Sequence, residues 1–261
     1  MSPNRPSDAL FRLDGQVAIV TGGGRGLGRA MAVALAQAGA DCVLVARRKA
    51  DLAESIAAIE AEAPGRRAAA VPGDVTDEGT ARAAVAAALE RFGRLDILIN
   101  NAGRYHMQPI EETSVEDWRG VLEVNLVGSF LFCKAAGPTF KRQGRGKVVN
   151  VASILGVKGV PGATAYCAAK AGVIHFTASL GAEWAPLGVN VNCIAPGLFD
   201  TDMSKAVFDN PELYKQIMAG IPRGQHGMPA DLAGTVIYLC SPASDHVVGQ
   251  TLHVDGGASI A

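Results

Sequence analysis

Short apolar runs alternate with helical segments along almost the entire chain. The runs "QVAIVTGG", "DCVLVA" and "GKVVNVAS" are rich in β-branched residues, which is typical of strands buried in a parallel sheet. Segments with helical spacing of apolar positions, such as "GLGRAMAVALAQAG", separate these runs. The alternation predicts an α/β fold of the Rossmann type: one doubly wound parallel sheet of about seven strands with helices on both faces.

The domain organisation follows from length and composition. The chain has 261 residues, and we expect one domain over residues 15–261 after a loose polar arm over residues 1–14 that contains two prolines. Neither a linker of low complexity nor an internal repeat divides the sequence.

Charge and composition exclude several partners. The net charge is −1, which argues against a nucleic-acid-binding protein. We expect no bilayer-spanning apolar run, and the start "MSPNRPSDALFRLDGQ" lacks the apolar core of a signal peptide, so we expect a cytoplasmic protein without a membrane partner. Five scattered cysteines favour free buried thiols, and the spacing of the five histidines predicts no metal site.

The glycine-rich segment "TGGGRGLG" lies between the first strand and the first helix, where an α/β sheet binds a nucleotide. Its spacing is Gly22-x-x-x-Gly26-x-Gly28, since Leu27 stands where G-x-G-x-x-G would require a glycine. Unpaired N–H groups and the positive helix dipole at this point favour a pyrophosphate. The segment therefore predicts a dinucleotide site, the alternative being a glycine-rich turn without a ligand.

The end of the second strand, "VLVARR", indicates which dinucleotide binds. NAD sites place an acidic residue on the ribose 2′-hydroxyl, but Ala46 occupies that position here and Arg47 and Arg48 follow. Arg25, inside the glycine loop, adds a second positive charge. We therefore expect NADP(H) rather than NAD(H), although NAD(H) stays possible because paired arginines are often merely solvated.

A tyrosine and a lysine stand four positions apart in "TAYCAAKAGV". On a helix Tyr166 and Lys170 share one face. A lysine ammonium beside a phenol favours the phenolate, so we expect Lys170 to lower the pKa of Tyr166. Such a tyrosine can exchange a proton with an alcohol or carbonyl oxygen.

The glycine loop, "NNAG" at 100–103, Asn125, Ser153, the Tyr-x-x-x-Lys pair and "PG" at 196–197 occur in this order. In this order and spacing the chain resembles the short-chain dehydrogenase/reductase family over about residues 15–257. The resemblance implies that Tyr166 is the catalytic acid/base, that Lys170 assists it and bonds the nicotinamide ribose, and that Ser153 holds the substrate oxygen. It implies that Asn125 shapes the neighbouring helix and holds a water of the proton relay. The implied cofactor contacts are Gly22, Arg25, Gly26, Leu27, Gly28, Arg47, Asp74, Val75, Asn101, Ala102, Gly103, Tyr166, Lys170, Pro196, Gly197 and Thr201.

The same resemblance bears on the substrate, a small carbonyl compound or alcohol. The stretch from Leu198 to Gly227 looks like the sugar-acid branch of the family, the gluconate 5-dehydrogenase and 2-deoxygluconate 3-dehydrogenase types. Candidate groups for a sugar acid are Lys158, Lys205, Arg223 and His106. A 3-oxoacyl thioester reductase is the alternative, and its apolar groove would use Ile154, Leu155, Val160, Leu198 and Phe199.

Two further expectations concern assembly and activity. Family members are commonly homotetramers, so the resemblance implies a homotetramer here. A cofactor-binding sensor or scaffold without catalysis is the alternative of a different class. That alternative would be expected to lose Ser153, Tyr166 or Lys170, and all three are present.

Overall fold

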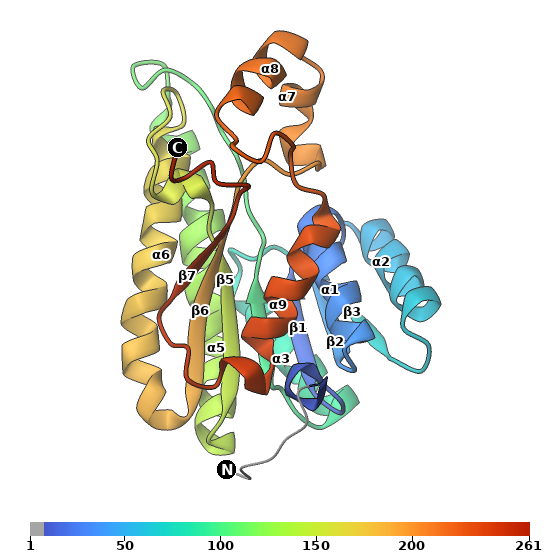
Figure 1. The fold of residues 1–261 in the computed structure, drawn as a ribbon. Helices are drawn as coiled ribbons and strands as arrows, with labels where there is room; N and C mark the ends of the chain where they lie inside the picture. The colour runs from blue at the N-terminus through green and yellow to red at the C-terminus, as the bar shows by residue number, and fades with distance from the viewer. Residues whose placement is uncertain (1–7) are drawn as a thin grey trace.

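Seven parallel strands form one sheet in the order β3-β2-β1-β4-β5-β6-β7, as the alternation predicts (Figure 1). The computed structural model describes residues 8–261. The strands are β1 (Val17–Thr21), β2 (Asp41–Ala46), β3 (Ala68–Pro72), β4 (Ile97–Asn100), β5 (Gly146–Val151), β6 (Val189–Pro196) and β7 (Thr251–Val254). Because all seven are parallel, their carboxyl ends meet at one edge of the sheet.

Helices cover both faces of this sheet (Figure 1). One face carries α1 (Gly26–Gln37), α2 (Lys49–Glu62) and α9 (Ala233–Cys240), and the other carries α3 (Glu78–Phe92), α5 (Gly128–Gln143) and α6 (Thr164–Trp184). In β1, Ala18 and Val20 pack into the first layer while Val17 and Ile19 pack into the second. A strand buried on both faces reads as a continuous apolar run rather than an alternating one, which is why "VAIV" was recognisable.

Residues at the helix ends set where the helices begin and end. At α3 the Asp77 carboxylate accepts hydrogen bonds from the backbone N–H groups of Gly79 and Thr80, and Gly93 closes the helix at φ 79°. Short 3₁₀ helices link the larger elements: η1 (Asp8–Phe11), η3 (Ile154–Gly156), η4 (Ala185–Leu187), η5 (Asp202–Ser204), η6 (Pro229–Leu232) and η7 (Pro242–Ser244).

One long helical stretch combines α4 (Val115–Leu122), a π-helical turn η2 (Glu123–Val127) and α5. By length and composition alone this stretch, with a mean hydropathy of 1.3 in its most apolar window, is long and apolar enough to cross a membrane. However, 44% of that window is buried inside the protein. Phe132 and Phe140 are fully buried against the sheet, so the apolar character of this helix serves the core.

The chain before β1 differs in part from the loose arm that we expected. Residues 1–7 of that arm lie outside the described residues. Asp8–Phe11 forms η1, Leu13 is fully buried, and its N–H donates to the Ala38 carbonyl. The last residues of the predicted arm therefore pack against α1.

A small helical unit stands above the carboxyl edge of the sheet (Figure 1). It comprises η5, α7 (Lys205–Phe208) and α8 (Pro211–Ala219). Phe208 and Tyr214 of this unit pack against His226, and the Tyr214 hydroxyl lies 2.9 Å from His226 Nδ1. We call this unit, residues 202–219, the lid.

Candidate active site

The glycine loop lies in the crevice between β1 and β4, where the strand order reverses. Gly22 has φ 64° and Gly26 has φ 53°, a backbone region that other residues rarely adopt. A Cβ on Gly28 would stand 2.2 Å from the Gly22 carbonyl oxygen, and one on Gly22 would stand 2.8 Å from Nδ2 of Asn101. Gly22 and Gly28 are therefore required by the packing of the loop itself.

Gly26 serves the cleft instead. A Cβ on Gly26 would meet just Thr201, at 3.6 Å, across open space. No side chain of residues 8–261 caps the start of α1, and its first turn contains no acidic residue. The N–H groups of this turn are thus available to an anion, and the arrangement fits the pyrophosphate of a dinucleotide.

A cleft of about 660 Å³ opens at this point. Most of the predicted cofactor contacts line it: Gly22, Arg25, Gly26, Leu27, Gly28, Arg47, Asp74, Val75, Asn101, Ala102, Gly103, Tyr166, Lys170 and Thr201. Asn125, Ser153, Pro196 and Gly197 lie outside its lining. Pro196 ends β6, and the Gly197 N–H donates to the Val254 carbonyl at 3.0 Å, so these two residues join β6 to β7.

The sequence reasoning missed several cleft residues: Gly24, Val45, Asp51, Gly73, Arg104, Tyr105, Val124, Val151, Asp202 and Met203. Most are chain neighbours of predicted residues. Their position beside a motif was the available signal. Asp202 and Met203 come from the lid, which carries no motif in the sequence.

Thr21, another residue that we did not predict, fixes the cleft's inner wall. Its Oγ1 accepts hydrogen bonds from the N–H groups of Asn101 (2.9 Å) and Ala102 (3.1 Å). The Asn101 side chain in turn donates to the Thr21 carbonyl at 3.0 Å. These bonds hold the loop after β4 against the end of β1.

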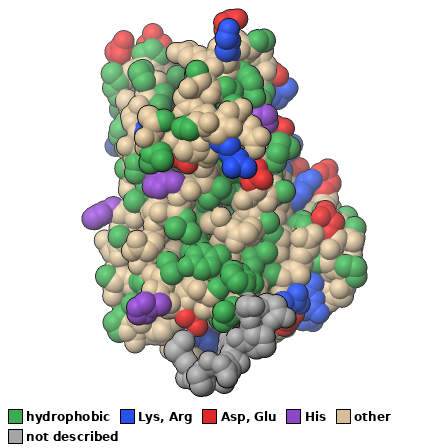
Figure 2. Space-filling view, in the orientation of Figure 1, with side chains coloured by type: hydrophobic (Ala, Val, Ile, Leu, Met, Phe, Trp, Pro, Cys, Tyr) green, Lys and Arg blue, Asp and Glu red, His purple; other side chains and the backbone are tan. Residues whose placement is uncertain are grey.

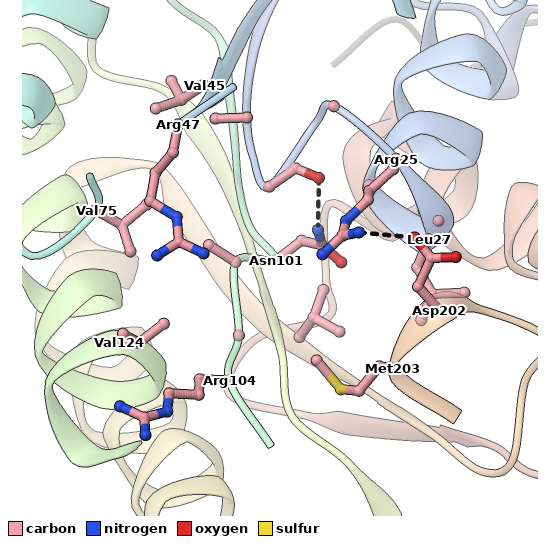
Figure 3. Close-up of a pocket in the computed structure, with 18 of the residues that line it drawn as sticks. Arg25, Leu27, Val45, Arg47, Val75, Asn101, Arg104, Val124, Asp202 and Met203 are labelled. Carbon is pink, nitrogen blue, oxygen red and sulfur yellow. Dashed lines mark hydrogen bonds and ion pairs between the residues drawn. The ribbon is translucent and has the colours of Figure 1, made fainter. Parts of the chain in front are cut away.

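Four arginines border the cleft, and their partners differ (Figure 3); Arg104, on the loop after β4, pairs with Asp117 at 2.7 Å. Arg25 pairs with Asp202 of the lid at 2.8 Å, and Arg48 pairs with Asp51 at 2.7 Å. Arg47 has no ion-pair partner within residues 8–261. The Arg47 guanidinium is therefore available to an anionic group at the Val75 end of the cleft.

Asn125 lies in the π-helical turn between α4 and α5. Its Nδ2 donates to the carbonyls of Val121 (2.9 Å) and Arg104 (2.8 Å). Its buried Oδ1 has no hydrogen-bond partner among the described residues. A Cβ on Gly103 would stand 2.9 Å from that oxygen and 3.7 Å from Nζ of Lys170, so an unpaired acceptor lies close to the lysine.

Tyr166 and Lys170 share one face of α6, as the spacing predicts. Lys170 Nζ donates to the Val151 carbonyl at 2.7 Å and lies 5.6 Å from the centroid of the Tyr166 ring. Ser153 follows β5, and its hydroxyl accepts a hydrogen bond from the Leu155 N–H at 3.1 Å. The Ser153 hydroxyl also acts on the pKa of Tyr166, so the two hydroxyls are neighbours.

The expectation that Lys170 lowers the pKa of Tyr166 was wrong for this structure. Burial raises the pKa of Tyr166 to about 12, against an opposing effect of the Ser153 hydroxyl. Burial also lowers the pKa of Lys170 to about 8. Desolvation disfavours the charged form of both groups, and the Lys170 ammonium is directed at the backbone carbonyl of Val151.

The candidate cations for a sugar acid do not line the cleft: Lys158, Lys205, Arg223 and His106. Lys158 donates to the carbonyls of Ala258 and Ala261. Lys205 pairs with Asp209 at 3.1 Å.

The five candidate residues of the apolar groove also lie outside the cleft lining. Phe199 is 5% exposed and belongs to the core, and Leu155 packs beside Tyr166 with Val121. Ile154, Val160 and Leu198 are partly buried outside the cleft lining.

The fold and this cleft define a dinucleotide-binding α/β protein with a Ser, Tyr and Lys group at one end of its nucleotide site. A family model described as enoyl-(acyl carrier protein) reductase matches residues 22–259. The chain is 39% identical to a 3-oxoacyl-[acyl-carrier-protein] reductase of Synechocystis over 95% of its length and 98% of the relative's. It is 39% identical to 2-dehydro-3-deoxy-D-gluconate 5-dehydrogenase of Escherichia coli over 95% of this chain and 97% of that one.

The structure of a gluconate 5-dehydrogenase from Burkholderia cenocepacia, in complex with NADP and tartrate, superposes with a TM-score of 0.93 at 36% identity. It covers 98% of this chain and 100% of that one. The chain belongs to the short-chain dehydrogenase/reductase family, oxidoreductases that act on alcohol and carbonyl groups with a nicotinamide cofactor.

Lys170→Met tests the buried charge through the pH dependence of stability. The pKa of Lys170 lies at about 8 in the folded protein instead of the ordinary 10.5. Between pH 8 and pH 10.5 the unfolded chain therefore binds more protons than the folded protein, and stability rises with pH. The wild-type free energy of unfolding should rise relative to the variant by about 3 kcal/mol from about pH 7 to about pH 10.5. Urea titrations of the cofactor-free proteins would measure the two free energies of unfolding, with the exposed Lys134→Met as control. A difference between wild type and Lys170→Met that stays constant with pH would contradict the buried charge.

Proposed function

We propose that this protein is an NADP-dependent oxidoreductase that transfers a hydride between the nicotinamide and a secondary alcohol or ketone of the sugar-acid type. The observation that carries the proposal is the meeting of Ser153, Tyr166 and Lys170 beside a cleft that fits a dinucleotide. The bound cofactor supplies or accepts the hydride, and the chain's own residues handle the proton and the developing charge.

In this mechanism Tyr166 is the acid/base. In reduction, negative charge develops on the carbonyl oxygen, and the Ser153 and Tyr166 hydroxyls donate hydrogen bonds to it. Tyr166 then gives up its proton; a pKa raised to about 12 keeps that proton in place before reaction. Lys170 stabilises the phenolate that results, and a water held by the unpaired Oδ1 of Asn125 returns the proton.

The cofactor would extend along the cleft. The glycine loop (Gly22, Gly26, Leu27, Gly28) would hold the pyrophosphate, and Asp74 and Val75 the adenine. The loop Asn101, Ala102 and Gly103 and the segment with Pro196, Gly197 and Thr201 would hold the nicotinamide half. Arg47 would take the 2′-phosphate, since Arg25 and Arg48 are already paired.

Relatives of this chain support two different substrate classes. The Escherichia coli and Burkholderia cenocepacia proteins named above act on, or are named for, sugar acids, and the second was crystallised with NADP. The Synechocystis relative is a 3-oxoacyl thioester reductase at the same identity, so that reaction is the second candidate. The buried Phe199 favours the first candidate because it offers no exposed apolar surface to an acyl chain.

Assembly and location belong to the same proposal. We propose a cytoplasmic homotetramer. Val115 on α4 and Phe130 on α5 are 65% and 46% exposed, and a subunit contact would cover them. Hydrophobic side chains also gather over α9 and the edge strand β7 (Figure 2), where Leu252 and Val254 are partly buried.

The activity is tested by oxidation of NADPH, with NADH in parallel, against 5-ketogluconate, 2-deoxy-3-ketogluconate and an acetoacetyl thioester. We expect turnover of a keto acid with NADPH preferred, because the cleft offers Arg47 and no acid at position 46. Turnover of the thioester alone would establish the second candidate. Tight cofactor binding without turnover would favour the non-catalytic sensor.

Tyr166→Phe should lower kcat by about 10²- to 10⁴-fold, because it removes the proton donor and leaves the ring in place. The dissociation constant of NADPH, measured by fluorescence, should change little. Tyr238→Phe on α9 is the matched control. Near-normal kcat in the Tyr166 variant, with cofactor bound, would refute the acid/base role.

Arg47→Ala should weaken NADPH binding on the order of tenfold or more, since a charged hydrogen bond to the 2′-phosphate is lost, and should leave NADH binding unchanged. Arg48→Ala, the adjacent arginine that pairs with Asp51, is the matched control. Titration of each protein with both cofactors measures the effect. Equal losses for the two cofactors would argue against a 2′-phosphate contact.

A further inference from the structure

Tyr105 lies beside Tyr166 and lines the same cleft, although no motif marks it. The two rings meet edge to face, with centroids 5.0 Å apart and planes at 79°. Tyr105 is 36% exposed, so it covers Tyr166 on one side and meets the open cleft on the other. It stands on the loop between β4 and α4.

The hydroxyl of Tyr105 has a weak partner. It donates to Sδ of Met107 at 3.4 Å, and a thioether sulfur is a poor hydrogen-bond acceptor. Its chain neighbours are already engaged: Arg104 pairs with Asp117 at 2.7 Å, and His106 Nε2 lies 3.2 Å from Oε1 of Gln108. Compared with Arg104 and His106, the Tyr105 side chain therefore exchanges its present hydrogen bond most easily for one to a substrate oxygen.

The same hydroxyl lies where the loop meets the segment between Ser153 and Tyr166. The Gln108 N–H donates to the Gly162 carbonyl at 2.8 Å, and a Cβ on Gly162 would stand 3.3 Å from Met107. The two segments are thus joined into one wall. Tyr105 places a hydroxyl on that wall next to the proposed proton donor.

We propose that Tyr105 is a specificity-determining residue, whose hydroxyl leaves Met107 to bind a substrate oxygen on a carbon adjacent to the reacting carbon. This rests on the proposed function, since Tyr166 must hold the reacting oxygen. Substrates with a hydroxyl beside the keto group gain this contact, and a ketone in an otherwise unsubstituted chain does not. The ring separately packs on Tyr166 and keeps that residue in position.

Two variants separate the hydroxyl from the ring. Tyr105→Phe removes the hydroxyl and keeps the edge-to-face contact, whereas Tyr105→Leu removes both. The probes are 5-ketogluconate and 5-oxohexanoate, which share the chain length, the carboxylate and the position of the keto group but differ in their hydroxyls.

We expect wild type to prefer 5-ketogluconate and Tyr105→Phe to lose about tenfold in kcat/KM for it, mainly through KM, with a change below about twofold for 5-oxohexanoate. NADPH affinity and the pH profile of kcat should stay as in wild type for Tyr105→Phe. Tyr105→Leu should lower kcat for both probes, because Tyr166 loses its packing partner.

Other outcomes would overturn the proposal in distinguishable ways. If wild type is active and Tyr105→Phe reduces 5-ketogluconate as well as wild type does, the role of the hydroxyl is refuted while the proposed function stands. The same holds if Tyr105→Phe is equally impaired on both probes. A wild type that binds NADPH but reduces neither probe nor an acetoacetyl thioester would refute the proposed function, and this inference with it. Turnover of the thioester alone, unaffected in Tyr105→Phe, would refute the inference and leave hydride transfer intact.

Discussion

The parallel direction of all seven strands is the constraint on which the rest of the structure depends. Parallel strands need crossovers, and these crossovers place helices on both faces, so the strands become apolar on both sides. The carboxyl ends then share one edge, and the reversal of strand order between β1 and β4 opens a crevice there. The hydrogen bonds between Thr21 and Asn101 hold the loop after β4 against the end of β1 in that crevice.

Burial governs the chemistry at the inner end of the cleft. Tyr166 is 7% exposed and Lys170 is 3% exposed; burial keeps Tyr166 protonated and neutral, and it lowers the pKa of Lys170 to about 8. A neutral tyrosine suits proton donation in reduction. Oxidation needs the phenolate as proton acceptor, so the rate of oxidation depends on how strongly the Lys170 ammonium stabilises that phenolate.

Charge pairing divides neighbouring arginines into different roles. Arg48 forms an ion pair with Asp51, and Arg25 forms one with Asp202 of the lid. Arg47 is therefore the arginine of the three that is available to a bound anion. The Arg25 pair also joins the glycine loop to the lid across the cleft. Because both partners are more than half exposed, we assign this pair little stability.

The sequence alone determined the sheet, because burial on both faces leaves continuous apolar runs such as 17–20 and 41–46 that periodicity can find. It also determined the glycine spacing and the Tyr166 and Lys170 pair, since local backbone geometry sets both. Tertiary structure decided what depends on distant contacts: the raised pKa of Tyr166, the pairing of Arg25 with Asp202, and the place of Tyr105 against the acid/base. Desolvation and ion pairing arise from residues far apart in the chain, and no local pattern encodes them.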